Sequence, residues 1–216
     1  MDVYKFDDEI ATINSIPSKR VYGERLITDE KTEMEYRLWN PNRSKLASAL
    51  LNGLSEINLK KDSKVLYLGA STGTTVSHIS DIVENGIIYA VEFSPVSMRK
   101  LSRLSQTRNN IVALLNDATK PKEYLNIIEK VDLVYCDVAQ ASQTKLFIDN
   151  MNIFLKSDGQ GVFMIKSRSI NVNIKPKTVF KEQEKILKAN GYKIIEKIKL
   201  EPYEKDHICF LVERSF

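Results

Sequence analysis

Four residues that lie far apart in the sequence, Lys45, Asp137, Lys166 and His207, have side chains suited to moving a proton. Lys166 is the most unusual of them, because it ends the apolar strand pattern GVFMIK. Its aliphatic stem would lie in the core and its ammonium at the edge of a sheet, where desolvation and other cations favour the neutral amine. Such a lysine could act as a general base. The alternative is a surface lysine whose charged end simply reaches water.

A second group of polar residues lies where apolar strand patterns end. The segment VLYLGASTGTT, residues 65–75, runs from a buried strand into a turn whose glycines lack the Cβ atoms that would hinder a close ligand. Ligands of an open α/β sheet bind outside the carboxyl ends of its strands, so such ends should face one crevice. The strand ends concerned are Gly69 to Thr75, Glu92 with Phe93, Asp117 with Ala118, and Asp137.

These strand ends suit a cofactor that contains a nucleoside. Glu92 follows Gly73 by 19 residues and could accept hydrogen bonds from a ribose diol. Asp117 could hold an adenine amino group, and Phe93 could lie against the ring. A single strand-end aspartate is more often a turn or cap residue, but four polar ends in order indicate a binding site. On this evidence NAD and S-adenosylmethionine (AdoMet) both remain open.

Other kinds of site find little support in the sequence. No cluster has metal-ligand spacing, and no Ser-His-Asp pattern suggests hydrolysis. Cys136 and Cys209 lie inside apolar strand patterns, which favours buried thiols in a reducing compartment, and His78 lies in a helix where a structural role is expected. The start MDVYKFDDEI does not resemble a signal peptide, and no apolar run approaches the roughly 18 residues of a membrane span. We therefore expect a cytoplasmic protein with no membrane contact.

Strand and helix patterns alternate along most of the chain, which predicts a parallel sheet covered on both faces. The expected strands cover residues 64–68, 87–92, 111–115, 132–136 and 161–166, and the expected helices residues 73–83, 95–107, 121–129, 141–155 and 177–190. The last two strand patterns, YKIIEKIKL and HICFLVER, are joined by a short connection and predict a terminal hairpin. The fold class is thus α/β, a seven-stranded Rossmann-like sheet with an antiparallel last strand, as in AdoMet-dependent methyltransferases.

The first part of the chain has a different pattern. The pieces RVYGERLIT and EMEYRLW predict a small antiparallel β meander, and RSKLASALLNGL predicts a helix that leads to the main sheet. We therefore expect a small β-rich domain with a linking helix over residues 1–53 and a methyltransferase domain over residues 54–216. At 216 residues and 43% hydrophobic composition, the chain is long enough for a proper core.

Charge is unevenly distributed along the chain. The formal net charge is +4, yet residues 166–205 hold 11 Lys or Arg against 5 Glu, a balance of +6, so the remainder sums to −2. A basic C-terminal third suits a polyanionic substrate or partner. The alternative is that Lys181, Lys185 and Lys188, which have helical spacing, form the solvated face of an amphipathic helix.

Several segments together resemble fibrillarin-like proteins: RVYGERL, EYRLWNPNRSKLA, KVLYLGASTGTTVSHISDIV, YAVEFS, DVAQ and LEPYEKDH. The resemblance runs from about residue 20 to the C-terminus. It implies the catalytic subunit of a box C/D ribonucleoprotein, which transfers methyl groups from AdoMet to ribose 2′-hydroxyls of rRNA and, in archaea, of tRNA. Because the sequence has no Gly/Arg-rich N-terminal tail, it is similar to the archaeal type.

The resemblance also implies roles for particular residues. The AdoMet contacts it implies fall on Thr74, Thr75, Glu92, Phe93, Asp117, Ala118, Asp137, Val138, Ala139 and Gln140. Its catalytic set falls on Lys45, Asp137, Lys166 and His207. One departure from the wider methyltransferase superfamily is Tyr67, which replaces the usual acidic residue before the first glycine of the turn, a variant that fibrillarin-like sequences share.

A mechanism and a set of partners follow as expectations. Lys166, kept partly neutral by nearby Lys45, would accept or relay the hydroxyl proton, while Asp137 would orient the lysines and His207 would position the substrate ribose or its phosphate. The resemblance implies as partners a box C/D guide RNA with its target RNA, a Nop-domain scaffold protein and a kink-turn-binding ribosomal-type protein. No base-reading module is evident, so a guide RNA would select the target.

Three other functions compete with this interpretation. An AdoMet methyltransferase for nucleobase amines would be expected to carry an Asn- or Asp-Pro-Pro-aromatic segment after the fourth strand, and DVAQ differs from it, while a protein side chain is a further possible acceptor. A binding module without catalysis would have no need of the four reactive residues. A dehydrogenase could use Glu92 equally well, but the Thr-rich turn and the terminal hairpin favour AdoMet.

Overall fold

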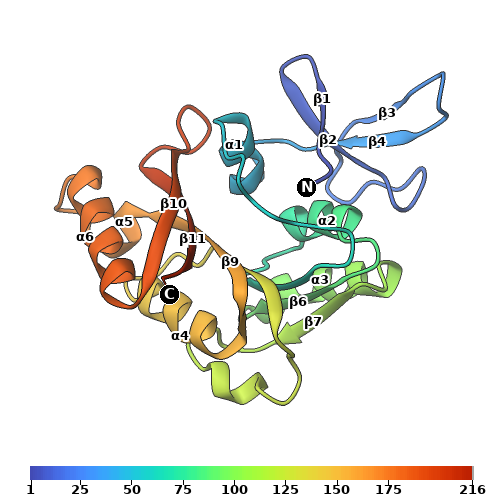
Figure 1. Cartoon of the computed structure of the whole chain (residues 1–216). Helices are drawn as coiled ribbons and strands as arrows, with labels where there is room; N and C mark the ends of the chain where they lie inside the picture. The colour runs from blue at the N-terminus through green and yellow to red at the C-terminus, as the bar shows by residue number, and fades with distance from the viewer. Residues whose placement is uncertain (216) are drawn as a thin grey trace.

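The structure, a computed structural model that describes residues 1–215, contains a seven-stranded and a four-stranded β-sheet (Figure 1). The larger sheet has the order β10-β11-β9-β8-β5-β6-β7. Its strands are β5 (Lys64–Leu68), β6 (Ile87–Glu92), β7 (Ile111–Leu115), β8 (Val131–Cys136), β9 (Leu155–Lys166), β10 (Tyr192–Lys199) and β11 (His207–Arg214). The first five strands are parallel to one another, whereas β11 pairs antiparallel with both β9 and β10. The predicted fold class is therefore confirmed.

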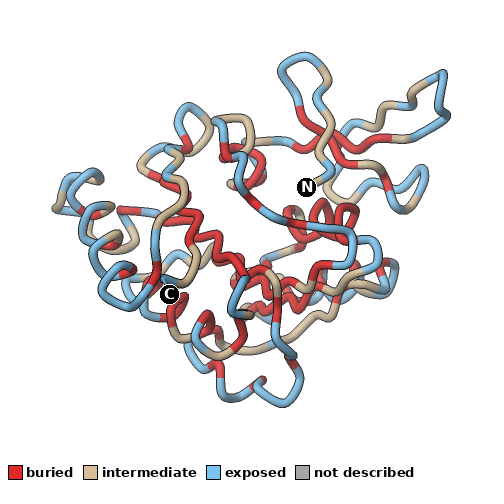
Figure 2. The backbone as a smooth tube through the Cα atoms, viewed as in Figure 1, coloured by how far each residue is buried: buried red, intermediate tan, exposed pale blue. Residues whose placement is uncertain are grey.

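Helices cover both faces of this sheet, because successive strand residues alternate between two apolar cores. The helices are α1 (Lys45–Leu51), α2 (Thr74–Ile82), α3 (Pro95–Thr107), α4 (Gln143–Phe154), α5 (Ser167–Ile170) and α6 (Pro176–Ala189), with a 3₁₀ turn at Pro121–Tyr124. One core joins Val65 and Tyr67 to α1, α2 and α3, and the other joins Leu66 and Leu68 to α4 and α6. Buried positions concentrate in the central strands and in α2 (Figure 2). None of the described helices has the length and apolar composition to cross a membrane.

The smaller sheet is built from the start of the chain. It consists of β1 (Tyr4–Phe6), β2 (Glu9–Ile13), β3 (Leu26–Thr28) and β4 (Glu35–Leu38), paired antiparallel in the order β1-β2-β4-β3. The predicted meander supplied β3 and β4, whereas β1 and β2 lie in a short polar segment that the sequence analysis did not assign. The division of the chain between residues 53 and 54 stays a prediction.

A buried polar cluster joins the smaller sheet to α2 and α3, and we call Glu24, Arg37, His78, Asp81 and Arg108 the junction cluster. The Arg37 guanidinium donates to Glu24 and to Asp81, at 2.7 Å each. Arg108 donates to the other Asp81 oxygen at 2.6 Å. His78 bonds Thr12 through Nδ1 and Tyr22 through Nε2, at 2.8 Å each, and stacks on Trp39, so its structural role is as expected.

Three elements differ from the sequence prediction. β9 begins at Leu155 rather than at residue 161, because an irregularity in its pairing with β8 accommodates the polar residues KSDG, which look like a turn in the sequence. The helix expected at residues 121–129 is only the 3₁₀ turn at Pro121–Tyr124. The short helix α5 was not predicted from the sequence.

β10 forms one open edge of the larger sheet. A bulge interrupts its pairing with β11 between Ile194 and Glu196, and Lys193, Lys197 and Lys199 alternate with less exposed residues along it. Lys193 pairs with Glu213 of β11, and Lys197 pairs with Glu184 of α6. This edge is therefore irregular, and charged side chains lie along it.

Candidate active site

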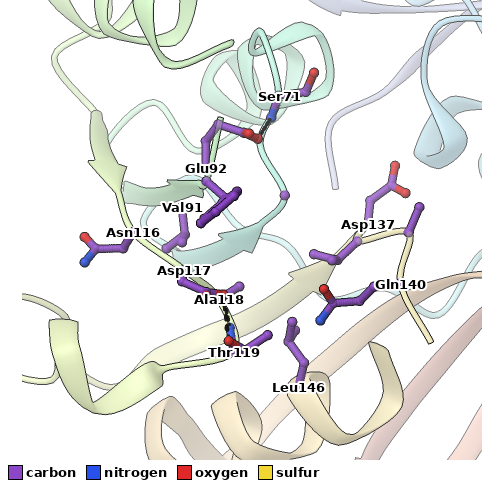
Figure 3. Close-up of a pocket in the computed structure, with 14 residues that line it drawn as sticks. Ser71, Val91, Glu92, Asn116, Asp117, Ala118, Thr119, Asp137, Gln140 and Leu146 are labelled. Carbon is purple, nitrogen blue, oxygen red and sulfur yellow. Dashed lines mark hydrogen bonds between the residues drawn. The ribbon is translucent and has the colours of Figure 1, made fainter. Parts of the chain in front are cut away.

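A cavity of about 380 Å³ opens at the carboxyl ends of the parallel strands (Figure 3). It brings together most of the predicted cofactor residues, namely Gly69, Glu92, Phe93, Asp117, Ala118, Asp137, Val138, Ala139 and Gln140. Glu92 and Asp137 lie on opposite sides of it. Thr74 and Thr75 line instead an adjoining hollow of about 270 Å³, which shares Gly69, Ser71 and Asp137 with the cavity. The predicted strand ends thus converge on one crevice with two compartments.

The Glu92 carboxylate is held rigidly at the end of β6. One oxygen accepts a hydrogen bond from the backbone N–H of Ser71 and the other from that of Ser94, each at 2.7 Å. Glu92 is only 9% exposed, so these two bonds offset part of the cost of burying a charged group. Each carboxylate oxygen has a further acceptor site, so Glu92 can still accept hydrogen bonds from a diol in the cavity.

Asp117 and Phe93 provide a second polar anchor and an apolar surface. One Asp117 oxygen accepts from the backbone N–H of Thr119 at 2.9 Å and from its hydroxyl at 2.7 Å. These bonds lower the pKa of Asp117, so this carboxylate is charged at neutral pH and its second oxygen can take a further donor. Phe93 is 72% exposed, which leaves its ring available to a planar ligand.

The two glycines of the turn after β5 are required by contacts within the protein. Gly69 has φ +81°, and a Cβ there would lie 2.5 Å from the carbonyl oxygen of Asp137. Gly73 has φ +92° at the N-cap of α2, and its Cβ would lie 2.5 Å from a methyl carbon of Leu104 in α3. The expectation that these glycines serve ligand approach is therefore incomplete, because they also let the turn pack against its neighbours.

Lys45 and Asp137 form an ion pair in the second compartment. The ammonium lies 3.1 Å from the carboxylate, and the two side chains are 23% and 21% exposed. Lys45 begins α1, whose N-cap is Ser44. The Ser44 hydroxyl accepts from the backbone N–H of Ala47 and from the hydroxyl of Thr75 at 2.9 Å, which ties the start of α1 to α2. The position of Lys45 is thus set by an N-cap that is hydrogen-bonded to the first turn of α2.

Lys166 and His207 lie opposite each other where β9 and β11 pair. Two residues away along their strands, Met164 and Cys209 belong to the core on the α1 face, as does Tyr135 two residues before Asp137. Because side chains alternate along a strand, Asp137, Lys166 and His207 all project on that face, at the edge where Lys45 lies. The structure therefore places the predicted catalytic set on one face and at one edge of the sheet.

The environments of Lys166 and His207 differ. Lys166 is exposed, so neighbouring protein groups do not supply the desolvation that the sequence predicted for its ammonium. His207 is 6% exposed, and its Nδ1 lies 2.7 Å from the carbonyl oxygen of Lys205. A carbonyl only accepts, so Nδ1 donates and Nε2 is the ring nitrogen left as an acceptor.

Several lining residues escaped the sequence analysis. Asn116, Thr119 and Leu146 line the cavity, and Arg43 lines the second compartment. Asn116 and Thr119 flank the predicted strand end at Asp117, so their proximity in sequence was a usable signal. Tyr67 lies beneath the second compartment, stacked on Tyr135 with ring centroids 4.3 Å apart. Burial raises the pKa of the Tyr67 phenol, so the residue that replaces the usual acid is neutral.

Comparison with known proteins places this geometry in a family. The family model described as fibrillarin matches residues 1–215. The fibrillarin-like rRNA/tRNA 2′-O-methyltransferase of Methanothermobacter thermautotrophicus is 52% identical over 213 residues, which cover 99% of this chain and 94% of that relative.

Solved structures agree with this assignment. Aeropyrum pernix fibrillarin, in complex with natively bound S-adenosyl-L-methionine, superposes with a TM-score of 0.88 at 42% identity, over 97% of this chain and 92% of that one. A fibrillarin/Nop5p complex superposes with a TM-score of 0.90 at 45% identity, over 98% and 97% of the two chains. The resemblance inferred from the sequence is confirmed: the chain belongs to the fibrillarin family.

Proposed function

We propose that this protein transfers methyl groups from AdoMet to ribose 2′-hydroxyls of rRNA and tRNA, as the catalytic subunit of a box C/D ribonucleoprotein. The observation that carries the proposal is the crevice itself, in which a cavity with two anchored carboxylates adjoins the Lys45–Asp137 ion pair. The relative from M. thermautotrophicus is named for this reaction, and the A. pernix structure contains this cofactor.

The donor and acceptor groups of the cavity fit AdoMet. Glu92 would accept from the ribose diol, Asp117 would accept from the adenine amino group, and Phe93 would lie against the ring. The segment Asp137 to Gln140 and the residues Thr74 and Thr75 would hold the remainder, since they line the rest of the crevice. When bound, AdoMet supplies a methyl group that is already electrophilic.

The chain's own residues then have to align the hydroxyl and take its proton. Lys166, as the neutral amine, accepts or relays this proton, since it projects on the same face and edge as Asp137 and its side chain forms no salt bridge or hydrogen bond within residues 1–215. Asp137 orients Lys45, to which it is bonded at 3.1 Å, and balances the positive charge of the lysines. His207 presents Nε2 to the substrate ribose or its phosphate.

Specificity is proposed to come from partners. A Nop-domain scaffold is supported by the fibrillarin/Nop5p complex that superposes on this chain. We propose in addition that a box C/D guide RNA pairs with the target RNA and that a kink-turn-binding ribosomal-type protein completes the particle. A cytoplasmic location is proposed as well, in keeping with the two buried free thiols, Cys136 and Cys209.

The decisive experiment compares two target RNAs in the assembled particle. The protein, its scaffold partners and a guide RNA are incubated with AdoMet that carries a labelled methyl group. The targets differ only by a 2′-deoxy substitution at the guided nucleotide. We expect labelling of the ribose target and loss of labelling with the deoxy target. Equal labelling of both targets would indicate a base or a protein as the acceptor.

A further inference from the structure

A hollow of about 540 Å³ lies outside the crevice just described, between the loop of residues 16–22 and α3. We call it the α3 groove. Its cationic lining residues are Lys19, Arg20, Arg43, Lys100, Arg103 and Arg108, and no Asp or Glu is among the lining residues in the described part of the chain. Three segments of the chain thus bring positive charge to one hollow.

Five of these six cations are not neutralised by the protein. The charge of Arg108 is balanced by Asp81 of the junction cluster. Lys19, Arg20, Arg43, Lys100 and Arg103 are exposed and form no salt bridge within residues 1–215. Like charges gathered in this way repel one another, and a polyanion in the groove would relieve the repulsion.

Two of the cations are held in place by uncharged groups. Arg20 donates from Nε to the backbone carbonyl of Glu24 at 3.0 Å, and the Arg43 guanidinium lies over the ring of Tyr22, 5.5 Å from its centroid. Interactions of this kind fix the direction of the side chains and leave their charge available. The groove is therefore partly organised before any ligand arrives.

The α3 groove adjoins the second compartment of the crevice. Arg43, Thr72 and Thr74 line both the groove and the hollow that contains Lys45 and Asp137. A strand with its reacting ribose at Asp137 could therefore continue past Arg43 into the groove. Phosphate groups spaced along such a strand would meet the cations of the groove in succession.

The lysines of α6 offer a contrast. Lys181 and Lys185 are exposed on α6, whereas Val179, Gln183 and Leu187 on the same helix are buried. Glu184 of the same helix pairs with Lys188 and with Lys197. This is the arrangement of a solvated helix face, with acidic residues among the basic ones. Lys181 and Lys185 form no salt bridge within residues 1–215, so they differ from the groove cations in position, because they do not line the groove or the crevice.

We infer that the α3 groove binds the phosphate backbone of the RNA strand that carries the acceptor ribose, at the nucleotides next to the methylated one. The inference rests on the proposed function, which identifies the bound strand as the RNA that is methylated. Interactions with phosphates position a strand without reading its bases, in keeping with sequence choice by a guide RNA. Binding at the groove should depend steeply on salt, because neutralising phosphates releases counterions.

The test uses two double variants that each remove two exposed positive charges from a helix. Lys100→Ala with Arg103→Ala changes the α3 groove, and Lys181→Ala with Lys185→Ala is the matched control on α6. The first measurement is the affinity of the full chain for a fluorescein-labelled RNA duplex over a series of salt concentrations. We expect the groove variant to lower the slope of log affinity against log salt by about 1 for each phosphate that it no longer neutralises. The α6 variant should behave like the wild-type protein.

The second measurement is methyl transfer in the assembled particle. The groove variant should raise the KM for target RNA with little change in kcat, while its affinity for AdoMet stays that of the wild type. Equal weakening of RNA binding by both variants, or weakening by the α6 variant alone, would overturn the inference. Weaker scaffold binding by the groove variant, with RNA binding unchanged, would also overturn it and would indicate an acidic protein surface as the occupant. If the wild-type particle methylated no ribose, the proposed function would fail, whereas the duplex measurement would still test the groove.

Discussion

Two polar regions of this molecule bring a carboxylate and cations together. They differ in how many of the hydrogen bonds and ion pairs of these charged groups are made within the protein. In the junction cluster Arg37 and Asp81 are completely buried, and their bonds run to protein groups on every side. In the crevice Lys45 and Asp137 are each about a fifth exposed, and Lys166 is exposed. A buried charge that is fully bonded has no capacity left for a ligand, whereas a partly exposed one has. The comparison assigns the junction cluster to folding and the crevice to chemistry.

The largest expected effect comes from Lys166→Ala, which tests the chemical half of the comparison. Removal of a group that accepts or relays a proton should lower kcat for methyl transfer by about 10²- to 10⁴-fold. Because Lys166 is exposed, the unfolding free energy and the affinity for AdoMet should stay close to those of the wild type. Single-turnover methylation, denaturant unfolding and equilibrium AdoMet binding measure the three quantities. Near-normal turnover would remove Lys166 from the mechanism.

The next effect comes from Arg37→Met, which tests the structural half. The substitution leaves Asp81 and Glu24 buried beside fewer donors, so the unfolding free energy should fall by about 3–5 kcal/mol. The methyl-transfer rate of the molecules that remain folded should change little. Lys45→Ala, which removes the cation of the partly exposed pair, is the control and should cost much less stability. Equal losses of stability in the two variants would show that the two regions do not differ as described.

The smallest expected effect is a pH dependence that sharpens the comparison. Burial, with Arg37 and Arg108 nearby, lowers the pKa of His78 well below its usual value, so only the unfolded state binds a proton as the pH falls. The stabilising contribution of neutral His78 is complete above about pH 6.5 and is lost below it, by up to about 1.4 kcal/mol per pH unit. Denaturant unfolding of the wild type and His78→Gln over a pH series isolates this slope as the difference between the two proteins. A difference that does not vary with pH would contradict the expected linkage.

Much of the candidate site could be predicted from the sequence, because the carboxyl ends of parallel strands must meet at one edge. Glu92, Asp117 and Asp137 each follow an apolar strand pattern, so local pattern and topology together place them in one crevice. The apolar alternation on the two faces likewise follows from strand geometry. Both predictions depend on short-range regularities, which a sequence displays directly.

The junction cluster and the α3 groove could not be predicted in this way. Arg37 lies in strand β4 of the smaller sheet and Asp81 in helix α2, and nothing local in either segment indicates that they meet. The groove likewise depends on how the loop of residues 16–22 packs beside α3. The sequence drew attention instead to the basic C-terminal third, because net charge along a chain does not reveal which cations the fold gathers in one hollow.

The edge strand β10 limits how this protein can associate with others. An exposed flat strand offers its backbone hydrogen-bonding groups to other chains, but a bulge distorts the spacing of these groups in β10 and exposed lysines lie along the strand. The β10 edge is therefore poorly suited to pair with a strand of another molecule. Any association at this edge would therefore have to come from side chains and not from added strand pairing.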